Sequence, residues 1–237
     1  MNFDSILWDL PGSGIERESF RRIDSEVAPE KKARFTPEQW HVARRLVHTG
    51  ADFAILDILE MTPDAVRAGL DALHRGCGIY TDSNMIKAGL SVPKLQKFNP
   101  AYTRESILCP VADPEVADYA KLHGITRALA AVELHKEYFR DCIFLCGNAP
   151  LALAGVAKLY AEQGIRPALI VGMPVGFVNV VESKKLLDEV KVPWIRLNGR
   201  RGGSPFAVAT LHGIMENELE LSVRLALCGK ATPPAVR

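Results

Sequence analysis

Five short apolar segments, separated from one another by helix-like stretches, constrain the fold of this 237-residue chain more than any other feature. The segments span residues 78–82, 105–111, 142–147, 168–172 and 192–198. Buried strands that alternate with helices are typical of a mostly parallel sheet covered on both faces. No repeat or linker interrupts the pattern, which predicts one α/β domain over residues 1–237, with a loose tail at 229–237.

Helix signals are clearest in the first third of the chain. A helix over residues 15–28 would place its apolar residues, from Ile15 to Val27, on one face. Thr36 is the expected N-cap of a second helix, and Gln39 would complete a capping box. This helix is expected to run to about His48 and to stop at Gly50. A third helix is expected to start at Thr62-Pro63 and to end near Gly76, while residues 53–61 fit either a strand or a short helix. Later helices are expected over residues 83–90, 113–140 with a break near Gly124, 150–163, 180–190 and 205–228.

The charge balance and the cysteines exclude several classes of protein. The chain has 29 Lys plus Arg against 28 Asp plus Glu, so no net field attracts nucleic acid or an anionic membrane. No apolar run reaches the length of a membrane span, and no signal peptide is recognised, which favours a cytoplasmic protein. The five cysteines form no CxxC pair, so neither a disulfide framework nor a metal site is expected. Cys142 and Cys146 would share one face of a buried strand.

Two glycine clusters follow predicted strands, at Gly172–Asn179 and at Gly199–Ser204. Either cluster alone is ordinary turn chemistry, but two at the same topological place predict a shared cleft where a ligand approaches the backbone. Free N–H groups at the following helix starts would suit a carboxylate or a phosphate. The nucleotide-binding signatures are absent, although spacing alone leaves a flavin site open.

Seven blocks stand in a fixed order along the chain: IxxESF, RxLVHTG, IYTDSNM, ITRALAA, CGNAP, GMPVGFVNVVESK and GRRGGSP. In this order the chain resembles the precorrin-8X methylmutase family of cobalamin biosynthesis, from about Ser13 to about Gly213. The resemblance implies a flavodoxin-like three-layer α/β/α fold, a homodimer with sites near the subunit interface, and no added cofactor. The implied reaction moves a methyl group within ring C of precorrin-8X or cobalt-precorrin-8, from an α-carbon to the neighbouring β-carbon. Its product is hydrogenobyrinic or cobyrinic acid, and the sequence does not distinguish the two because cobalt would arrive inside the macrocycle.

The resemblance implies that His48, in the block Arg45-Leu46-Val47-His48, is the catalytic residue. A methyl shift consumes neither water nor electrons, so the site needs a proton donor rather than a nucleophile. His48 would lie in the last turn of its helix, where the helix dipole favours the charged imidazole. The same position suits a structural histidine that satisfies terminal carbonyls. Arg45 would clamp a substrate carboxylate or orient its neighbours. The other histidines are expected on the surface or in packing roles: His41, His74, His123, His135 and His212.

Further substrate-binding residues are implied by the same blocks. They are Ser19, Arg45, Asp82, Ser83, Met85, Thr126, Arg127, Gly147, Asn148, Ala149, Pro150, Gly172, Val175, Gly176, Phe177, Val178, Lys184, Gly202, Gly203 and Ser204. Thr126 is equally explained as an N-cap, and Lys184 equally fits a solvated helix face. The roles of Asp82 and Arg201 stay open. Two other functions stay open as well: a corrinoid-binding protein without catalysis, and a flavin enzyme on the same fold.

Overall fold

Six strands form one sheet in the computed structural model, which describes residues 3–4, 6, 8–9 and 11–228. The strands are β1 (Leu59–Met61), β2 (Gly78–Thr81), β3 (Ile107–Leu108), β4 (Cys142–Cys146), β5 (Leu169–Gly172) and β6 (Trp194–Leu197). Their order is β1-β6-β5-β4-β2-β3, with β1 antiparallel to β6 and all other neighbours parallel. Numbered by themselves along the chain, the parallel strands have the flavodoxin-like order 2-1-3-4-5, which confirms the predicted fold class.

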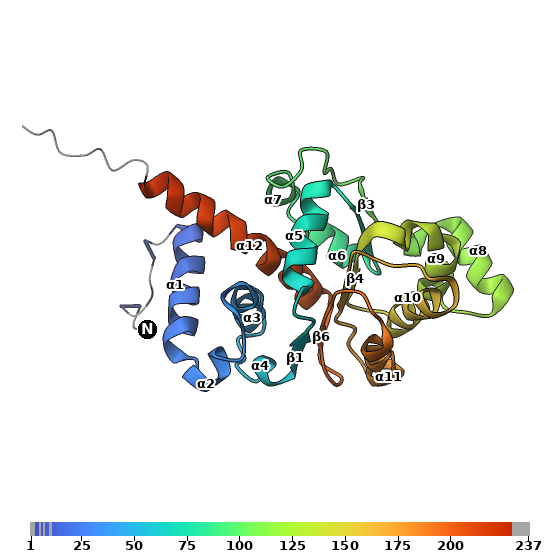
Figure 1. The fold of residues 1–237 in the computed structure, drawn as a ribbon, viewed down its shortest axis with the longest axis horizontal. Helices are drawn as coiled ribbons and strands as arrows, with labels where there is room; N and C mark the ends of the chain where they lie inside the picture. The colour runs from blue at the N-terminus through green and yellow to red at the C-terminus, as the bar shows by residue number, and fades with distance from the viewer. Residues whose placement is uncertain (1–2, 5, 7, 10, 229–237) are drawn as a thin grey trace, which may run out of the picture.

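Helices cover both faces of this sheet (Figure 1). On one face α5 and α12 pack on the central strands, and α3 packs against α12. On the other face α10 packs on β4 and is flanked by α9 and α11. The helices are α1 (Gly12–Glu26), α2 (Pro29–Lys32), α3 (Pro37–Gly50), α4 (Ile55–Ile58), α5 (Ala65–Arg75), α6 (Asn84–Gly89), α7 (Val92–Leu95), α8 (Pro114–His123), α9 (Arg127–Leu134), α10 (Pro150–Gln163), α11 (Val180–Lys185) and α12 (Ser204–Cys228), with short 3₁₀ helices η1 (Pro110–Ala112), η2 (Lys136–Asp141) and η3 (Leu186–Glu189).

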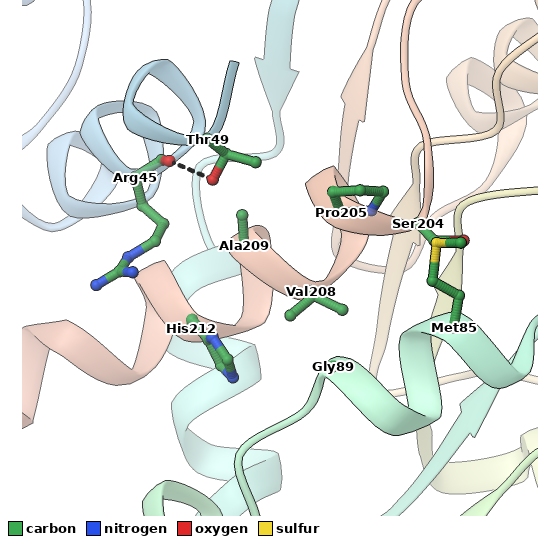
Figure 2. Close-up of a pocket in the computed structure, with 9 residues that line it drawn as sticks. All are labelled: Arg45, Thr49, Met85, Gly89, Ser204, Pro205, Val208, Ala209 and His212. Atoms are coloured by element: carbon green, nitrogen blue, oxygen red, sulfur yellow. Dashed lines mark hydrogen bonds between the residues drawn. The ribbon is translucent and has the colours of Figure 1, made fainter. Parts of the chain in front are cut away.

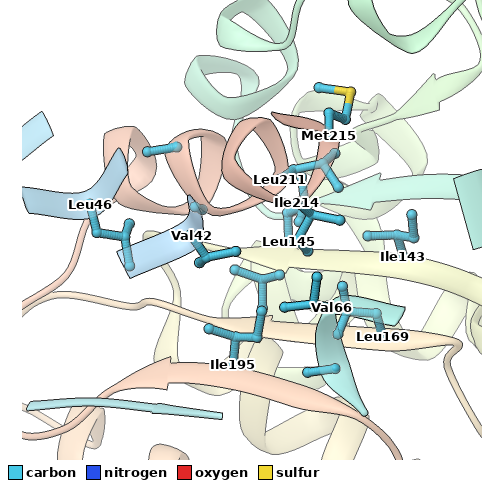
Figure 3. Packing of buried hydrophobic residues seen from close by; sticks show 14 of the residues in the cluster. Val42, Leu46, Val66, Ile143, Leu145, Leu169, Ile195, Leu211, Ile214 and Met215 are labelled. Atoms are coloured by element: carbon cyan, nitrogen blue, oxygen red, sulfur yellow. The ribbon is translucent and has the colours of Figure 1, made fainter. Parts of the chain in front are cut away.

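The residues of β4 alternate between two separate apolar cores, because successive side chains of a strand point to opposite faces. Ile143 and Leu145 join the core beneath α5 and α12, and Figure 3 shows them close to Ile214. Phe144 and both cysteines of the strand join the core beneath α10. Cys142 and Cys146 therefore share one buried face as predicted, and both are free thiols.

The start of α3 confirms the predicted capping box, but its end differs from the prediction. Gln39 N–H donates to Thr36 Oγ1 at 3.3 Å, and Thr36 N–H donates to Gln39 Oε1 at 3.1 Å. Gly50 is the last helical residue rather than the stop, and Ala51 takes the left-handed conformation with φ 48°. Gly50 has a packing role instead, since a Cβ atom there would lie 2.5 Å from Ile55 Cδ1.

The other predicted helices and strands differ from the structure mainly at their ends. Residues 53–61 form both of the expected alternatives in succession, α4 and then the edge strand β1. The helix expected at Thr62-Pro63 starts at Ala65, and the strand expected over 105–111 shrinks to β3. Ile15 was expected to share one apolar face of the first helix with Val27, but Ile15 is 51% exposed whereas Val27 is buried. The expected loose tail, 229–237, lies outside the described residues.

Candidate functional site

The two glycine clusters meet backbone to backbone beyond the carboxyl ends of β5 and β6. Gly203 N–H donates to the Met173 carbonyl at 2.7 Å, and Gly176 N–H donates to the Arg200 carbonyl at 3.2 Å. A Cβ atom at Gly202 would lie 2.2 Å from the same Met173 oxygen. The predicted convergence is therefore present, but the group that approaches these glycines closely is the other loop rather than a ligand.

Two further glycines assigned to substrate are packed inside the protein. A Cβ atom at Gly147 would lie 2.7 Å from the Cα atom of Ser204, so the turn after β4 lies directly on the start of α12. Gly172 is a buried residue of β5, and a Cβ atom there would lie 2.9 Å from Leu187 Cδ1. Close packing of the chain on itself explains each glycine.

Lys184 is neither a solvated lysine nor a substrate clamp at the surface. Its side chain is 1% exposed, and its Nζ donates to the carbonyl oxygens of Gly199 at 2.9 Å and Arg201 at 2.7 Å. Burial lowers the pKa of Lys184 to about 8. The ammonium group thus holds the second glycine cluster in place from beneath. The guanidinium of Arg201 pairs with Asp52 at 2.5 Å on the surface, which answers the question left open for Arg201.

Asp82 binds the turn that was expected to receive an anionic ligand. Its carboxylate is 3% exposed and accepts the backbone N–H groups of Gly147 at 3.0 Å, Asn148 at 2.8 Å and Ala149 at 2.6 Å. Burial raises the pKa of Asp82, and these three donors oppose that rise. The protein's own carboxylate therefore occupies the predicted anion site, and these three hydrogen bonds hold the turn from Gly147 to Ala149 in place.

A pocket of about 300 Å³ lies beside these loops, where α3, α6 and α12 meet (Figure 2). It is lined by Arg45, Thr49, Met85, Gly89, Ser204, Pro205, Val208, Ala209 and His212. The Ser83 and Ser204 hydroxyls share a hydrogen bond of 2.9 Å, which ties the start of α6 to the start of α12. Met85 is 66% exposed at the rim. The pocket thus brings together three residues predicted for substrate: Arg45, Met85 and Ser204.

Arg45 lines the pocket but is already paired with carboxylates of the protein. Its guanidinium is 9% exposed and forms ion pairs with Glu16 at 2.8 Å and with Glu216. It also stacks 4.9 Å from the ring centre of Phe20. These contacts leave Arg45 suited to orienting its neighbours, and they argue against the alternative role as a substrate clamp.

His48 is half-buried on the α1 side of the last turn of α3. Its ring meets Phe20 edge-on, with ring centres 5.3 Å apart. It lies next to Thr49 in sequence but is not among the residues that line the pocket. Burial and the nearby Arg45 guanidinium lower its pKa, and Glu16 opposes them. The pKa of His48 therefore falls, whereas the helix dipole was expected to favour the charged imidazole.

The sequence predicts a surface or packing role for His212, but the structure places it in the pocket wall. Ser204, Val208 and His212 are spaced four apart on α12 and face the same cavity. That spacing was available in the sequence, eight residues after a motif already singled out, and it could have identified His212.

The remaining predicted residues lie outside this pocket. Leu129 N–H donates to Thr126 Oγ1 at 3.3 Å, so Thr126 is the N-cap of α9. Arg127 is exposed at the start of α9, a helix that packs against α10. Ser19 is half-buried on α1. The loop after β5 exposes three apolar residues: Val175 (46%), Phe177 (83%) and Val178 (74%). Among the described residues, no helix is both long and apolar enough to cross a membrane.

The fold and the site define a flavodoxin-like α/β protein with a small pocket beside tightly packed glycine loops. The precorrin-8X methylmutase family matches residues 14–217. The chain is 37% identical to the cobalt-precorrin-8 methylmutase of Leptospira interrogans (86% of this chain, 93% of that protein) and 38% identical to that of Methanocaldococcus jannaschii (84% and 89%). The solved structure of precorrin-8X methylmutase from Thermus thermophilus matches with a TM-score of 0.77 at 39% identity, covering 87% of this chain and 98% of that one. The chain belongs to the precorrin-8X methylmutase family.

Proposed function

We propose that this protein is a corrin-ring methylmutase of cobalamin biosynthesis. It would shift a methyl group within ring C of precorrin-8X or cobalt-precorrin-8, to give hydrogenobyrinic or cobyrinic acid. The observation that carries the proposal is the family match over residues 14–217, together with full-length relatives that share this activity in their names. We place the reaction in the cytoplasm, which fits the free thiols of Cys77, Cys109, Cys142 and Cys146.

We propose His48 as the general acid. Its lowered pKa makes the imidazolium a stronger proton donor, although less of it is charged at neutral pH. A bound substrate brings several carboxylates close to this end of α3, and their negative charge would raise the pKa of His48 again. Phe20 contacts the ring edge-on, which restricts the ring on one side. Protonation of the conjugated macrocycle would then favour the tautomer in which the methyl group migrates.

The test compares His48→Ala and His48→Asn with the parent enzyme, following conversion by the change in the visible spectrum. Turnover is expected to fall by about two to four orders of magnitude in both variants, the usual range for loss of a general acid. Product binding and folding should persist. In the parent, turnover should decline as the pH rises through the pKa of bound His48, and this limb should be absent from the variants. A His48→Ala enzyme with near-parental turnover would exclude His48 as the acid, and a parent that binds product without any conversion would favour a corrinoid-binding protein.

We propose that substrate contacts come from the pocket and from exposed side chains near it. Met85 and Ser204 border the pocket, and Val175, Phe177 and Val178 offer an apolar surface to the ring. Arg127 is an exposed cation suited to a peripheral carboxylate. No added cofactor is needed for this isomerisation.

We propose that the active protein is a homodimer with its sites close to the subunit interface. The pocket measures about 300 Å³, the lower end of the range for small-molecule sites, whereas the substrate is a macrocycle with several side chains. One chain therefore encloses only an edge of it. Phe177 and Val178 are large exposed apolar residues, and at a site near the interface a second subunit would cover the part of them that the macrocycle leaves exposed. Sedimentation equilibrium should give a dimer at micromolar concentration, and a fully active monomer would overturn the proposal.

A further inference from the structure

His212 has a hydrogen-bond pattern that fixes which ring nitrogen carries its proton. Ser91 N–H donates to His212 Nε2 at 3.2 Å. A nitrogen that accepts a hydrogen bond in this way carries no proton, so the proton of the neutral ring is on Nδ1. Burial is the main cause that lowers the pKa of His212 to about 4, with Lys94 and Arg45 adding to it and Glu16 opposing it. The ring is therefore neutral at pH 7.

The Nδ1–H group is a donor without an acceptor among the described residues. The ring lines the pocket, and Figure 2 shows it at the same end as Arg45, away from Ser204 and Met85. A hydrogen-bond donor held at a fixed place in a largely apolar pocket is suited to bind an oxygen atom of a ligand.

Lys94 adds a charge at the same end. It belongs to α7, which starts just after Ser91, and it interacts electrostatically with His212, Arg45 and Glu16. In the part of the chain that the structure describes, no carboxylate lies within ion-pairing distance of its ammonium group. The cation of Arg45, in contrast, is balanced by Glu16 and Glu216. Arg45 and Lys94 together match the charge of Glu16 and Glu216, but both carboxylates pair with Arg45, so the Lys94 ammonium group stays available to pair with an incoming carboxylate.

We propose that His212 and Lys94 form a subsite for one peripheral carboxylate of the corrinoid, in which His212 Nδ1–H donates to the carboxylate and Lys94 supplies the opposite charge. The inference rests on the proposed function for the identity of the ligand. The ring of His212 takes no part in proton transfer, because protonation would require it to give up the Ser91 hydrogen bond. It is a binding residue, separate from the acid His48.

Two amide substitutions distinguish the roles of the two ring nitrogens of His212. His212→Gln can keep an acceptor for Ser91 N–H but loses the donor at the Nδ1 position. His212→Asn keeps a donor near the Nδ1 position but loses the acceptor. Affinity for hydrogenobyrinic acid and cobyrinic acid is measured by spectrophotometric titration. We expect His212→Gln to melt like the parent and to bind product about ten- to a hundredfold more weakly, the range for loss of a hydrogen bond to a charged group. His212→Asn should bind within about threefold of the parent and melt at a lower temperature.

Lys94→Met and an NMR measurement keep the inference testable if a His212 variant fails to fold. Lys94→Met should weaken product binding about tenfold. In ¹⁵N-histidine-labelled parent protein, long-range ¹H–¹⁵N correlations should show His212 as the Nδ1–H tautomer from pH 6 to pH 8. Parental affinity in both His212→Gln and Lys94→Met, or an Nε2–H tautomer, would overturn the subsite. A parent protein that neither converts substrate nor binds product would instead overturn the proposed function.

Discussion

Burial of His212 should make the protein markedly less stable in mild acid. The folded state lowers the pKa of His212 from 6.5 to about 4, so the unfolded chain binds a proton more readily than the folded one between these values. Stability therefore rises with pH across this window. The contribution of the neutral His212 ring to the free energy of unfolding is fully present above pH 6.5 and is lost as the pH falls towards 4. Lys94, Arg45 and Glu16 are the charged groups that act on this ring.

The size of the effect follows from the shift. A difference of about 2.5 pKa units corresponds to about 3.4 kcal/mol when the loss is complete, and to about 2 kcal/mol at pH 5. Urea unfolding of the parent and of His212→Gln, at one protein concentration and at several pH values from 7.5 to 5, measures this loss. Other titrating groups are present in both proteins, so they cancel in the difference between the two.

The expected result is a parent protein that loses about 2 kcal/mol more stability than His212→Gln between pH 7.5 and pH 5. Parallel curves for the two proteins would refute the reasoning. They would mean that His212 takes up its proton in the folded state as easily as in the unfolded chain, and that its ring is not held neutral in the pocket.

Three further substitutions test the contacts that stabilise the loops beside the pocket and the start of α3. Asp82→Asn should cost about 2–4 kcal/mol of unfolding free energy in urea, because an amide cannot accept all three backbone N–H groups of the turn after β4; an unchanged midpoint would contradict this role. Gly202→Ala should cost roughly 1–3 kcal/mol and lower turnover, since its methyl group would collide with the Met173 carbonyl and separate the two glycine clusters; parental stability and activity would show that the loops yield freely. Thr36→Ala should cost about 1 kcal/mol, or roughly 2–4 °C in melting temperature, through loss of the capping box at the start of α3; no shift by calorimetry would mean that water replaces the cap.

Local signals in the sequence predicted much of the fold and less of the site. The capping box at Thr36 and the alternating burial in β4 depend on neighbours within a few residues, so the sequence reveals them directly. The hydrogen bonds of Asp82 and Lys184, in contrast, go to backbone groups 65 and 15 residues away in the sequence. These partners come close only because the whole fold sets the paths of the loops. The sequence therefore suggested that these two charged side chains bind the ligand, whereas in the structure their partners are backbone groups of the same chain.

The polar groups of this site divide into those that the protein uses itself and those that it leaves for a ligand. Asp82 and Lys184 have their hydrogen bonds filled by the loops, and the guanidinium of Arg45 is balanced by two carboxylates. Such buried contacts fix the loops in one arrangement. Because these residues already have partners within the protein, they are not available to bind a substrate. Recognition would then fall to the few side chains that stay unfilled or exposed, among them His212 and the apolar residues at the rim. A large, rigid macrocycle needs this kind of preformed frame, because orientation of its ring C decides which carbon receives the methyl group.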